Sequence, residues 1–457
     1  MLLGWLFVAL VPLAFYLTAQ HYLDRDQLLF LTFASGVVLL WVFRLVPDFV
    51  PGLALIILVV LLNIIPQDIA LGGFGSEIFF LVFGVFVLSA LLSESAWFDR
   101  VEAILNRNHA SFRTGIWSIL GAGVLLTLMV PSPLGRASML QPMVSRLWQR
   151  GGRRRNSVLA AAHVHAVTLM STIVLTGNPL NFVLIGLLEE QSRGRFAWLG
   201  WLFATWFAGV FLCAVLLAAF AIAGRIADAK DGAATRSQRP AEKTDLPPVG
   251  LQDWATLGLY GLLFGAILGR DIHQIPLQWV VMLLGIAVFF FSGISLTSLR
   301  RKFDWPTLVF IATVVAWGPM LDHLGLSDQL AESVSFLEPI FVESFYHGLF
   351  VMIAVVLSVR LAVPGAPAFI LLASTLMPMG ENIGVSAWVL GFVIITISES
   401  FIWPYQHGVS SQTVSELETE GVDYSPTLLL FSNIFFLAMR CIAIVLCVSW
   451  WIQIDLI

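Results

Sequence analysis

The sequence predicts an all-α polytopic membrane protein built as an inverted repeat, with two re-entrant hairpins, two broken helices and about 11 transmembrane segments. Three observations lead to this fold class: the composition, the apolar runs of spanning length, and two matched sets of Pro/Gly interruptions. Of 457 residues, 58% are hydrophobic and 12% are charged. Soluble domains have about 25% charged residues, so this composition is typical of a chain that faces lipid.

Eleven apolar runs are long enough for a membrane crossing. They lie near 2–19, 27–43, 51–65, 77–94, 157–175, 197–224, 254–270, 277–299, 305–321, 385–400 and 427–452. Two other regions have arms that flank a proline-rich tip, at residues 131–136 and 363–367. The arm from Leu134 to Leu147 is roughly 20 Å long at about 1.5 Å per residue. Because a ~30 Å hydrocarbon core needs more, we expect two re-entrant hairpins.

The strongest interruption follows the first hairpin, where the chain reads Thr176-Gly-Asn-Pro-Leu-Asn181. Pro179 cannot donate a backbone hydrogen bond and Gly177 tolerates unusual dihedral angles, so the helix must break there. Asn178 before proline is also a helix-start signal. A matching break is expected after the second hairpin, at Trp403-Pro404.

These landmarks divide the chain into five parts: scaffold helices, a first hairpin with its broken and closing helices, a linker, and the same two sets again. The boundaries are 1–113, 114–224, 225–252, 253–340 and 341–457. Most of the 24 lysines and arginines fall in loops on the side of the N-terminus, and the opposite loops hold Arg25, Arg193, Arg195 and Arg270. The positive-inside rule therefore predicts a cytoplasmic N-terminus and linker in an inner (plasma) membrane protein.

Four helix starts are expected to meet near the bilayer midplane, each with a proline in or near its first turn. Helix N-termini present free amides and about half a positive charge each, which favours an anion. Arg136 and Arg360 stand at the two tips, and a buried arginine needs a partner or a bound anion. Beside them lie further candidate substrate contacts, which are small or polar: Ser132, Thr176, Gly177, Asn178 and Asn181. In the other interpretation, the arginines snorkel or pair with Glu343, Glu381 or Glu399.

Other polar residues give weaker signals. Glu399 is a candidate for coupling, either by exchanging a proton or by pairing with an arginine, or it is a plain helix-end carboxylate. His407 either contacts substrate or is an ordinary loop residue. His163 and His165 lie two apart on one helix and point to different faces, and no metal motif is present, so we expect no metal and no organic cofactor. Basic blocks typical of nucleic-acid binding are absent, and the lipid bilayer is the expected partner.

The stretch Thr176-Gly-Asn-Pro-Leu-Asn181, at a broken helix after a hairpin, resembles the divalent anion–sodium symporter family, related to the citrate and arsenite permeases. Asp304-Trp305 opening a span and Gly325-Leu326 after it are similar to the same family. The resemblance implies an elevator-type secondary transporter, a homodimer, in which hairpins and broken helices move against a scaffold. It implies dicarboxylates, citrate or sulfate as substrates, with sodium as the usual coupling ion.

The chain departs from that family at the tips, which normally carry Ser-Asn-Thr. Ser132 matches at the first tip, whereas the second tip reads Val363-Pro-Gly-Ala-Pro367. Our hypothesis is a non-enzymatic transporter of a small anion, coupled to sodium or protons. The alternatives are transport of a different oxyanion by exchange, and an enzymatic or non-transporting membrane protein on the same fold.

Overall fold

The structure is a computed structural model that describes residues 2–92, 100, 112–148, 151–231, 249–269, 273–292 and 295–457. Throughout these residues the regular elements are helices. The elements before the first hairpin are α1 (Leu2–Ala19), α2 (Arg25–Val42), α3 (Phe49–Leu61), α4 (Gln67–Ala70) and α5 (Glu77–Leu92). The hairpin is α7 (Phe112–Met129) and α8 (Pro133–Trp148), followed by α9 (Arg153–Thr168), α10 (Pro179–Leu187), α11 (Glu190–Arg193) and α12 (Trp198–Asp231).

The second half also has a hairpin, a broken helix and a closing helix in that order. It contains α13 (Leu251–Leu268), α15 (Leu277–Ser292), α16 (Leu296–Lys302), α17 (Trp305–Val315), α18 (Trp317–His323), α19 (Leu326–Ser333) and α20 (Glu338–Glu343). The second hairpin is α21 (Phe345–Ala362) and α22 (Gly365–Leu376), followed by α23 (Ala387–Ser398), α24 (Gly408–Thr419) and α25 (Pro426–Gln453). Both predicted hairpins are therefore present as helix pairs that end at the expected tips.

Seven helical segments among the described residues are long and apolar enough to cross a membrane. They are α1, α2, α7, α12, the segment Trp305–His323, α21 and α25. Several other predicted crossings are shorter apolar helices, among them α3, α5, α15 and α23. The apolar runs thus predicted the positions of the helices more accurately than their lengths.

The predicted linker begins later than residue 225. Helix α12 continues to Asp231, because Ile226 and Ala227 extend its apolar face and Asp228 accepts a hydrogen bond from Arg155 at 2.7 Å. The central part of that linker, residues 232–248, lies outside the described residues.

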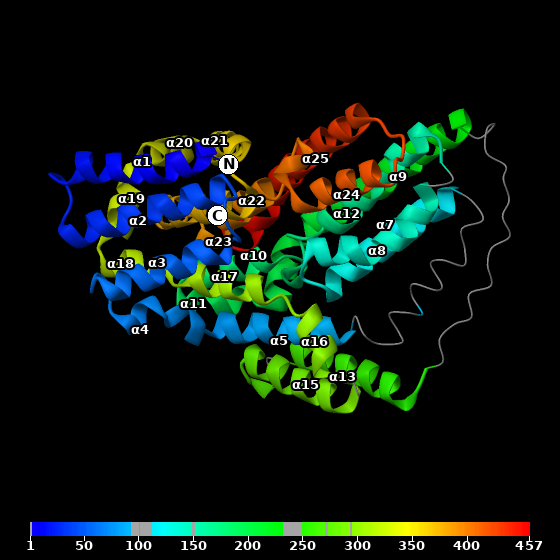
Figure 1. Cartoon of the computed structure of the whole chain (residues 1–457), viewed down its shortest axis with the longest axis horizontal. Helices are drawn as coiled ribbons and strands as arrows, with labels where there is room; N and C mark the ends of the chain where they lie inside the picture. Colours follow the sequence, from blue (N-terminus) through cyan, green and yellow to red (C-terminus); the bar gives the residue numbers. More distant parts are fainter. Residues whose placement is uncertain are drawn as a thin grey trace.

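Both broken helices lie in the centre of the molecule. Every residue of α9 from Asn156 to Thr168 is buried, and so is every residue of α23 from Trp388 to Ser398. A helix that is buried on all sides is typical of a protein core and leaves no face for lipid. Figure 1 shows α1 to α4 at one end of the molecule and α7, α8 and α12 at the other.

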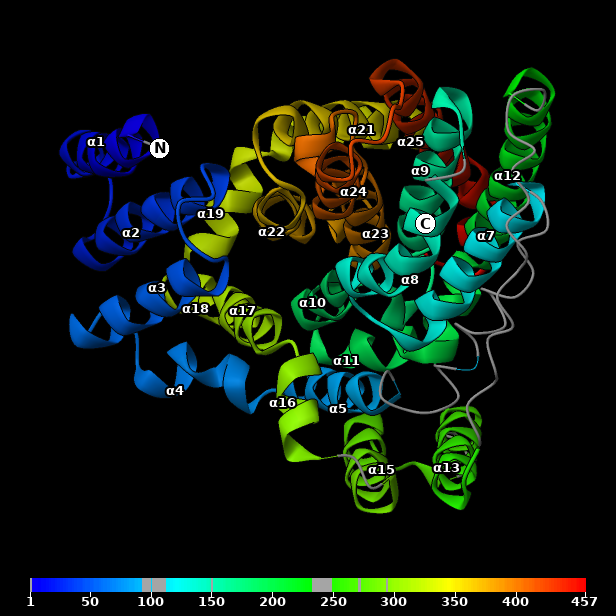
Figure 2. The ribbon, with the colours of Figure 1, turned by 45° about the vertical axis from the view of Figure 1, so that its right-hand side comes forward.

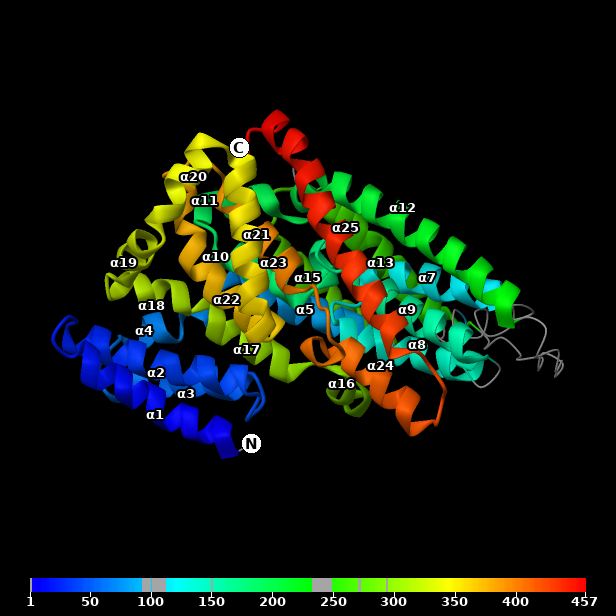
Figure 3. The ribbon, with the colours of Figure 1, turned by 90° about the horizontal axis from the view of Figure 1, so that it is seen from above.

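The hairpins pack against the helices that break. Helix α7 contacts α8 and α9, and α22 contacts α21 and α23. Figure 2 shows α22, α23 and α24 on one side of α9 and α10, and Figure 3 shows α12 and α25 running together along the outside. Half-helix α10 contacts α5 and α17, and so joins the broken-helix region to the remaining helices.

Candidate functional site

The first break occurs where the sequence predicts it. Helix α9 ends at Thr168, an irregular stretch follows, and α10 starts at Pro179 with Asn178 as its N-cap. The side-chain oxygen of Asn178 accepts a hydrogen bond from the Leu180 amide at 2.9 Å. An Asn cap followed by proline satisfies one free amide and fixes the first φ, so this short sequence begins the helix.

The second break is present, but its half-helix starts four residues later than predicted. Pro404 lies in a short 3₁₀ turn, and α24 begins at Gly408 with His407 as its N-cap. The turn closes because the Gln406 side-chain oxygen accepts hydrogen bonds from the Ile402 and Trp403 amides at 2.8 and 2.9 Å. Nδ1 of His407 accepts a hydrogen bond from the Val409 amide at 3.2 Å, as an N-cap does.

Arg136, in the first turn of α8, joins the first hairpin tip to the first break. Its guanidinium is fully buried and donates to the carbonyl of Val130 at the tip at 2.5 Å and of Gly177 before the α10 cap at 2.8 Å. It also donates twice to Val167 O near the end of α9, at 3.2 and 2.6 Å. These carbonyls lack helix partners because the helices end there, so the arginine satisfies groups that would otherwise be buried unpaired.

Arg360, at the end of α21, does the same at the second break. It donates to Val363 O at the tip at 3.0 Å, to Ser398 O at the end of α23 at 2.6 Å, and to Gln406 O before the α24 cap at 2.6 Å. Both predicted arginines are therefore buried at the breaks. Their donors point at main-chain carbonyls, and no ion pair between them and an acidic side chain occurs among the described residues.

A third arginine, which the sequence reasoning did not select, lies between the two breaks. Arg440 of α25 donates to Thr168 O at 2.8 Å and to Thr396 O at 3.2 Å, and also to the Ser400 hydroxyl at 3.3 Å. Arg440 is the single charged residue in the 28 residues of α25. That isolation in an apolar helix was the available signal, because an intramembrane ionisable residue is a functional-site candidate by default.

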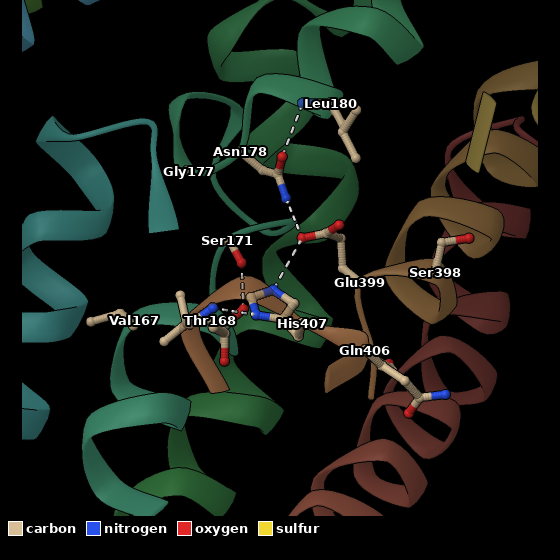
Figure 4. A network of polar contacts seen from close by, with 12 residues as sticks. Val167, Thr168, Ser171, Gly177, Asn178, Leu180, Ser398, Glu399, Gln406 and His407 are labelled. Atoms are coloured by element: carbon tan, nitrogen blue, oxygen red, sulfur yellow. Dashed lines mark hydrogen bonds and ion pairs between the residues drawn. The ribbon is translucent and has the colours of Figure 1, made fainter. Parts of the chain in front are cut away.

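Glu399 connects the two breaks directly. Nδ2 of Asn178 donates to Glu399 Oε2 at 2.6 Å, and Nε2 of His407 lies 3.7 Å from the same oxygen. Figure 4 shows Asn178 and His407 approaching the carboxylate from two sides. The tip of the second hairpin is also adjacent, since a Cβ built on Gly365 would lie 3.2 Å from Glu399 Oε1. Asn178, Glu399 and His407 thus form one cluster.

The remaining predicted residues hold the first break in shape. Ser132 caps α8 by accepting from the Gly135 amide at 3.2 Å, and Thr176 Oγ1 donates to Leu128 O of the hairpin arm at 3.1 Å. Nδ2 of Asn181 donates to the carbonyls of Ser171 and Val174 at 2.9 Å each and of Leu175 at 3.2 Å.

Gly177 is needed at the first break because of close approach. A Cβ there would lie 2.6 Å from Ser171 O and 2.9 Å from Thr127 Cγ2, distances that real side chains do not adopt. The glycine therefore lets the broken segment fold back against α7 and against its own start.

Buried charge at the site is unequal. Apart from histidines, the charged side chains in the described core are Arg136, Arg360, Arg440 and Glu399. Three arginines facing one glutamate leave an excess of positive charge inside the protein, and the helix N-termini of α8, α10, α22 and α24 add to it. The C-terminal carbonyls of α9 and α23 offset part of that charge, and the remainder attracts an anion.

Among the described residues, no group of three or more His, Cys, Asp or Glu side chains is placed to hold a metal ion. His163 contacts Ala137 O at 3.0 Å, whereas His165 lies 3.4 Å from the Ser432 hydroxyl. The two histidines therefore point to different partners, as their spacing predicts.

Comparison with protein-family models identifies the family of this chain. The model of the family described as citrate transporter (CitMHS) matches residues 2–397. The chain belongs to the citrate transporter family. The resemblance to the divalent anion–sodium symporter family is finer than this match and stays a prediction.

Solved structures agree on the fold. The chain is similar to the crystal structure of the YdaH transporter of Alcanivorax borkumensis, with a TM-score of 0.54 and 16% identity over 94% of this chain and 99% of that chain. A comparison with curated proteins finds no match. A citrate transporter family member with this fold is an integral membrane protein that moves citrate-like anions as a secondary transporter, without enzymatic chemistry.

Proposed function

We propose that the anion binds at the cluster of Asn178, Glu399 and His407, beneath the two hairpin tips. The observation that carries this proposal is the excess of buried positive charge, because three arginines and one glutamate lie in a core that lacks another charged group among the described residues. An uncompensated buried charge costs several kcal/mol, so a divalent anion at this place stabilises the protein as well as being bound by it.

The start of α22 is the first contact that we assign to a substrate carboxylate. Its N-cap, Pro364, has no side-chain acceptor, and no side-chain cap occurs at this helix start. Two amides at this helix start, those of Gly365 and Ala366, are therefore free to donate to an oxyanion, since Pro367 has no N–H and the Ala368 amide donates to Pro364 O. Asn178 and Asn181 hold the opposite wall, and Arg136 and Arg360 act by long-range attraction and by fixing the break carbonyls.

Protons are the coupling ion that the cluster supports best. When Glu399 binds a proton, its negative charge disappears beside the substrate site while the three arginines stay charged. Anion binding and proton binding then favour each other, which is the requirement for symport. Sodium remains the alternative, since Asn181 Oδ1 and Ser398 Oγ are buried oxygens without a hydrogen-bond partner, and oxygens are the ligands that hard cations prefer.

An elevator-type movement is supported by the arginine contacts. Arg136 and Arg360 each tie one hairpin tip to the break behind it, so tip and break move together. In this proposal the moving part slides along α5 and α17, which α10 contacts. A homodimer in the inner membrane with its N-terminus in the cytoplasm completes the proposal, on the basis of the resemblance and the charge distribution.

The test is flux into proteoliposomes. Radiolabelled citrate, succinate and sulfate are offered under an inward proton gradient, under an inward sodium gradient, and in exchange mode without either gradient. We expect proton-driven citrate accumulation, and we expect Glu399→Gln to lose gradient-driven accumulation while citrate–citrate exchange persists. If accumulation depended on the sodium gradient alone, sodium would be the coupling ion, with Asn181 Oδ1 and Ser398 Oγ as its candidate ligands. Sulfate exchange without citrate flux would favour the oxyanion alternative.

A further inference from the structure

A cavity of about 640 Å³ lies at the far end of α9 from the break. Helices α9, α12 and α25 surround it, and its lining includes Arg153, Arg154, Thr427, Val158, Ile226 and Phe431. Because α9 has 16 residues, the cavity is roughly 20 Å from the Thr168 end of that helix. Its volume is in the range of about 300–1,000 Å³ that is typical of small-molecule sites, and it is separate from the cluster at Glu399.

One end of the cavity is built to attract an anion. Arg153 and Arg154 are the first residues of α9, and Thr427 is the second residue of α25. The N-cap of α9, Gly152, provides no side-chain acceptor, so the first amides of this helix are free to donate. The free amides come from α9, because α25 begins with Pro426 and the Ser425 hydroxyl accepts from its Leu428 amide at 3.4 Å. Helix α25 adds the positive end of its dipole at the same place.

The charges around the cavity leave Arg154 available. Arg153 donates to Tyr424 O at 3.2 Å and lies 3.6 Å from Asp423. Asp228, the other nearby acid, accepts a hydrogen bond from Arg155 at 2.7 Å. Arg154 makes no hydrogen bond or ion pair with a residue that the structure describes, and its side chain is exposed.

The other end of the cavity is apolar and opens toward lipid. Ile226 is 52% exposed and Phe431 is 65% exposed, on α12 and α25, which are both long and apolar enough to span a membrane. Exposed apolar side chains on such helices face hydrocarbon. A small soluble anion would leave this apolar half of the cavity unfilled, whereas an acyl chain would fill it.

We propose that this cavity binds an anionic glycerophospholipid, with the phosphate at Arg154 and the N-termini of α9 and α25 and an acyl chain against Ile226 and Phe431. Basic pockets between transmembrane helices on the cytoplasmic side are suited to lipid phosphates. The lipid would rest on the start of the same helix whose end forms the first break.

The test compares lipids on the full-length protein purified in detergent, with bound lipid measured by native mass spectrometry and thermal stability measured in parallel. We expect phosphatidylglycerol to bind and stabilise, and phosphatidylcholine with the same acyl chains to do so much less. Arg154→Gln should weaken phosphatidylglycerol binding by about tenfold, the loss of one charge-assisted hydrogen bond. Arg225→Gln, an exposed arginine of α12 outside the cavity lining, is the matched control and should change nothing.

Three outcomes would overturn the proposal. Equal binding of the two lipids would remove the role of the phosphate charge, and unchanged binding in Arg154→Gln would place the lipid elsewhere. Displacement of the lipid by inorganic phosphate at similar concentration would identify a free-anion site. Phe431→Ala tests the apolar end independently, because it should weaken long-chain lipid while leaving binding of a short-chain phosphatidylglycerol unchanged.

Discussion

At both helix breaks an arginine satisfies buried main-chain carbonyls that lack helix partners. The two arginines come from different arms of their hairpins. At each break an arginine donates hydrogen bonds to three kinds of carbonyl: one at the hairpin tip, one at the end of the helix before the break, and one just before the next N-cap. Arg136 enters from the arm after its tip, and Arg360 enters from the arm before its tip. Both breaks therefore need a hydrogen-bond donor for unpaired backbone carbonyls at membrane depth, and this donor can come from either arm of the hairpin.

The breaks differ in their ionisable groups. The helix before the first break is followed by Leu169 and the next half-helix is capped by Asn178, whereas the corresponding places at the second break hold Glu399 and His407. The first break supplies neutral donors and the second supplies groups that can gain or lose a proton. This difference is the basis for the coupling role that we propose for the second half of the chain, and the following variants test that division.

Removing Arg136 should have the largest effect. Arg136→Ala leaves the carbonyls of Val130, Val167 and Gly177 buried without donors, at about 1–3 kcal/mol each. We expect loss of monodisperse protein in size-exclusion chromatography, and a similar but smaller loss for Arg360→Ala, which makes three such bonds in place of four.

Arg146→Ala is the matched control for this pair, because Arg146 is exposed on the same helix as Arg136 and should tolerate the change. Should Arg136→Ala stay folded and simply stop transporting, the arginine would be a substrate ligand and not a partner of the backbone. Arg136→Gln is expected to behave like the alanine variant, since an amide cannot replace four guanidinium bonds.

Asn178→Asp should have the next largest effect. The variant places a second carboxylate where Asn178 now donates to Glu399 at 2.6 Å. Two like charges at this distance repel, so one of them must bind a proton or the contact must open. We expect citrate transport to fall by at least about tenfold at neutral pH and to recover partly as the pH is lowered, measured as uptake into proteoliposomes. If uptake by the variant were unchanged at every pH, Asn178 would have no influence on proton binding at Glu399.

Glycine substitutions give an effect of intermediate size. Gly177→Ala brings a Cβ to 2.6 Å from Ser171 O, so we expect a loss of about 1–3 kcal/mol in thermal unfolding measurements. Gly121→Ala in α7 has nothing within 4 Å of the new Cβ and should be neutral or slightly stabilising. Equal stability of the two variants would show that the first break is looser than its contacts indicate.

His407→Asn should have the smallest effect on stability and is the most informative about the comparison. Asparagine is a good N-cap, so α24 keeps its start and the unfolding temperature should change little. The second break then has the same cap as the first and lacks its histidine. We expect the pH profile of uptake to shift while expression stays the same; an unaltered profile would assign the proton response to Glu399 alone.

The sequence was most informative where proline and glycine interrupt apolar runs. Asn178-Pro179 and the two tips marked helix ends correctly because those residues restrict the backbone locally. Contacts between distant segments were not predictable in this way. The carbonyl partners of Arg136 and Arg360, and the place of Arg440 between the breaks, depend on how the helices pack. The shift of the second cap from Trp403 to His407 depends on the Gln406 side chain, whose role is visible only in the folded turn.

Arg440 also imposes an order on biosynthesis. The carbonyls of Thr168 and Thr396 accept hydrogen bonds from Ser171 and Ser400 within their own breaks, and their further donor is Arg440, which leaves the ribosome after both breaks have been made. Until α25 is inserted, each of these carbonyls has only its local donor. The charge-assisted hydrogen bonds that join the two breaks through Arg440 therefore form only when the final helix is in place.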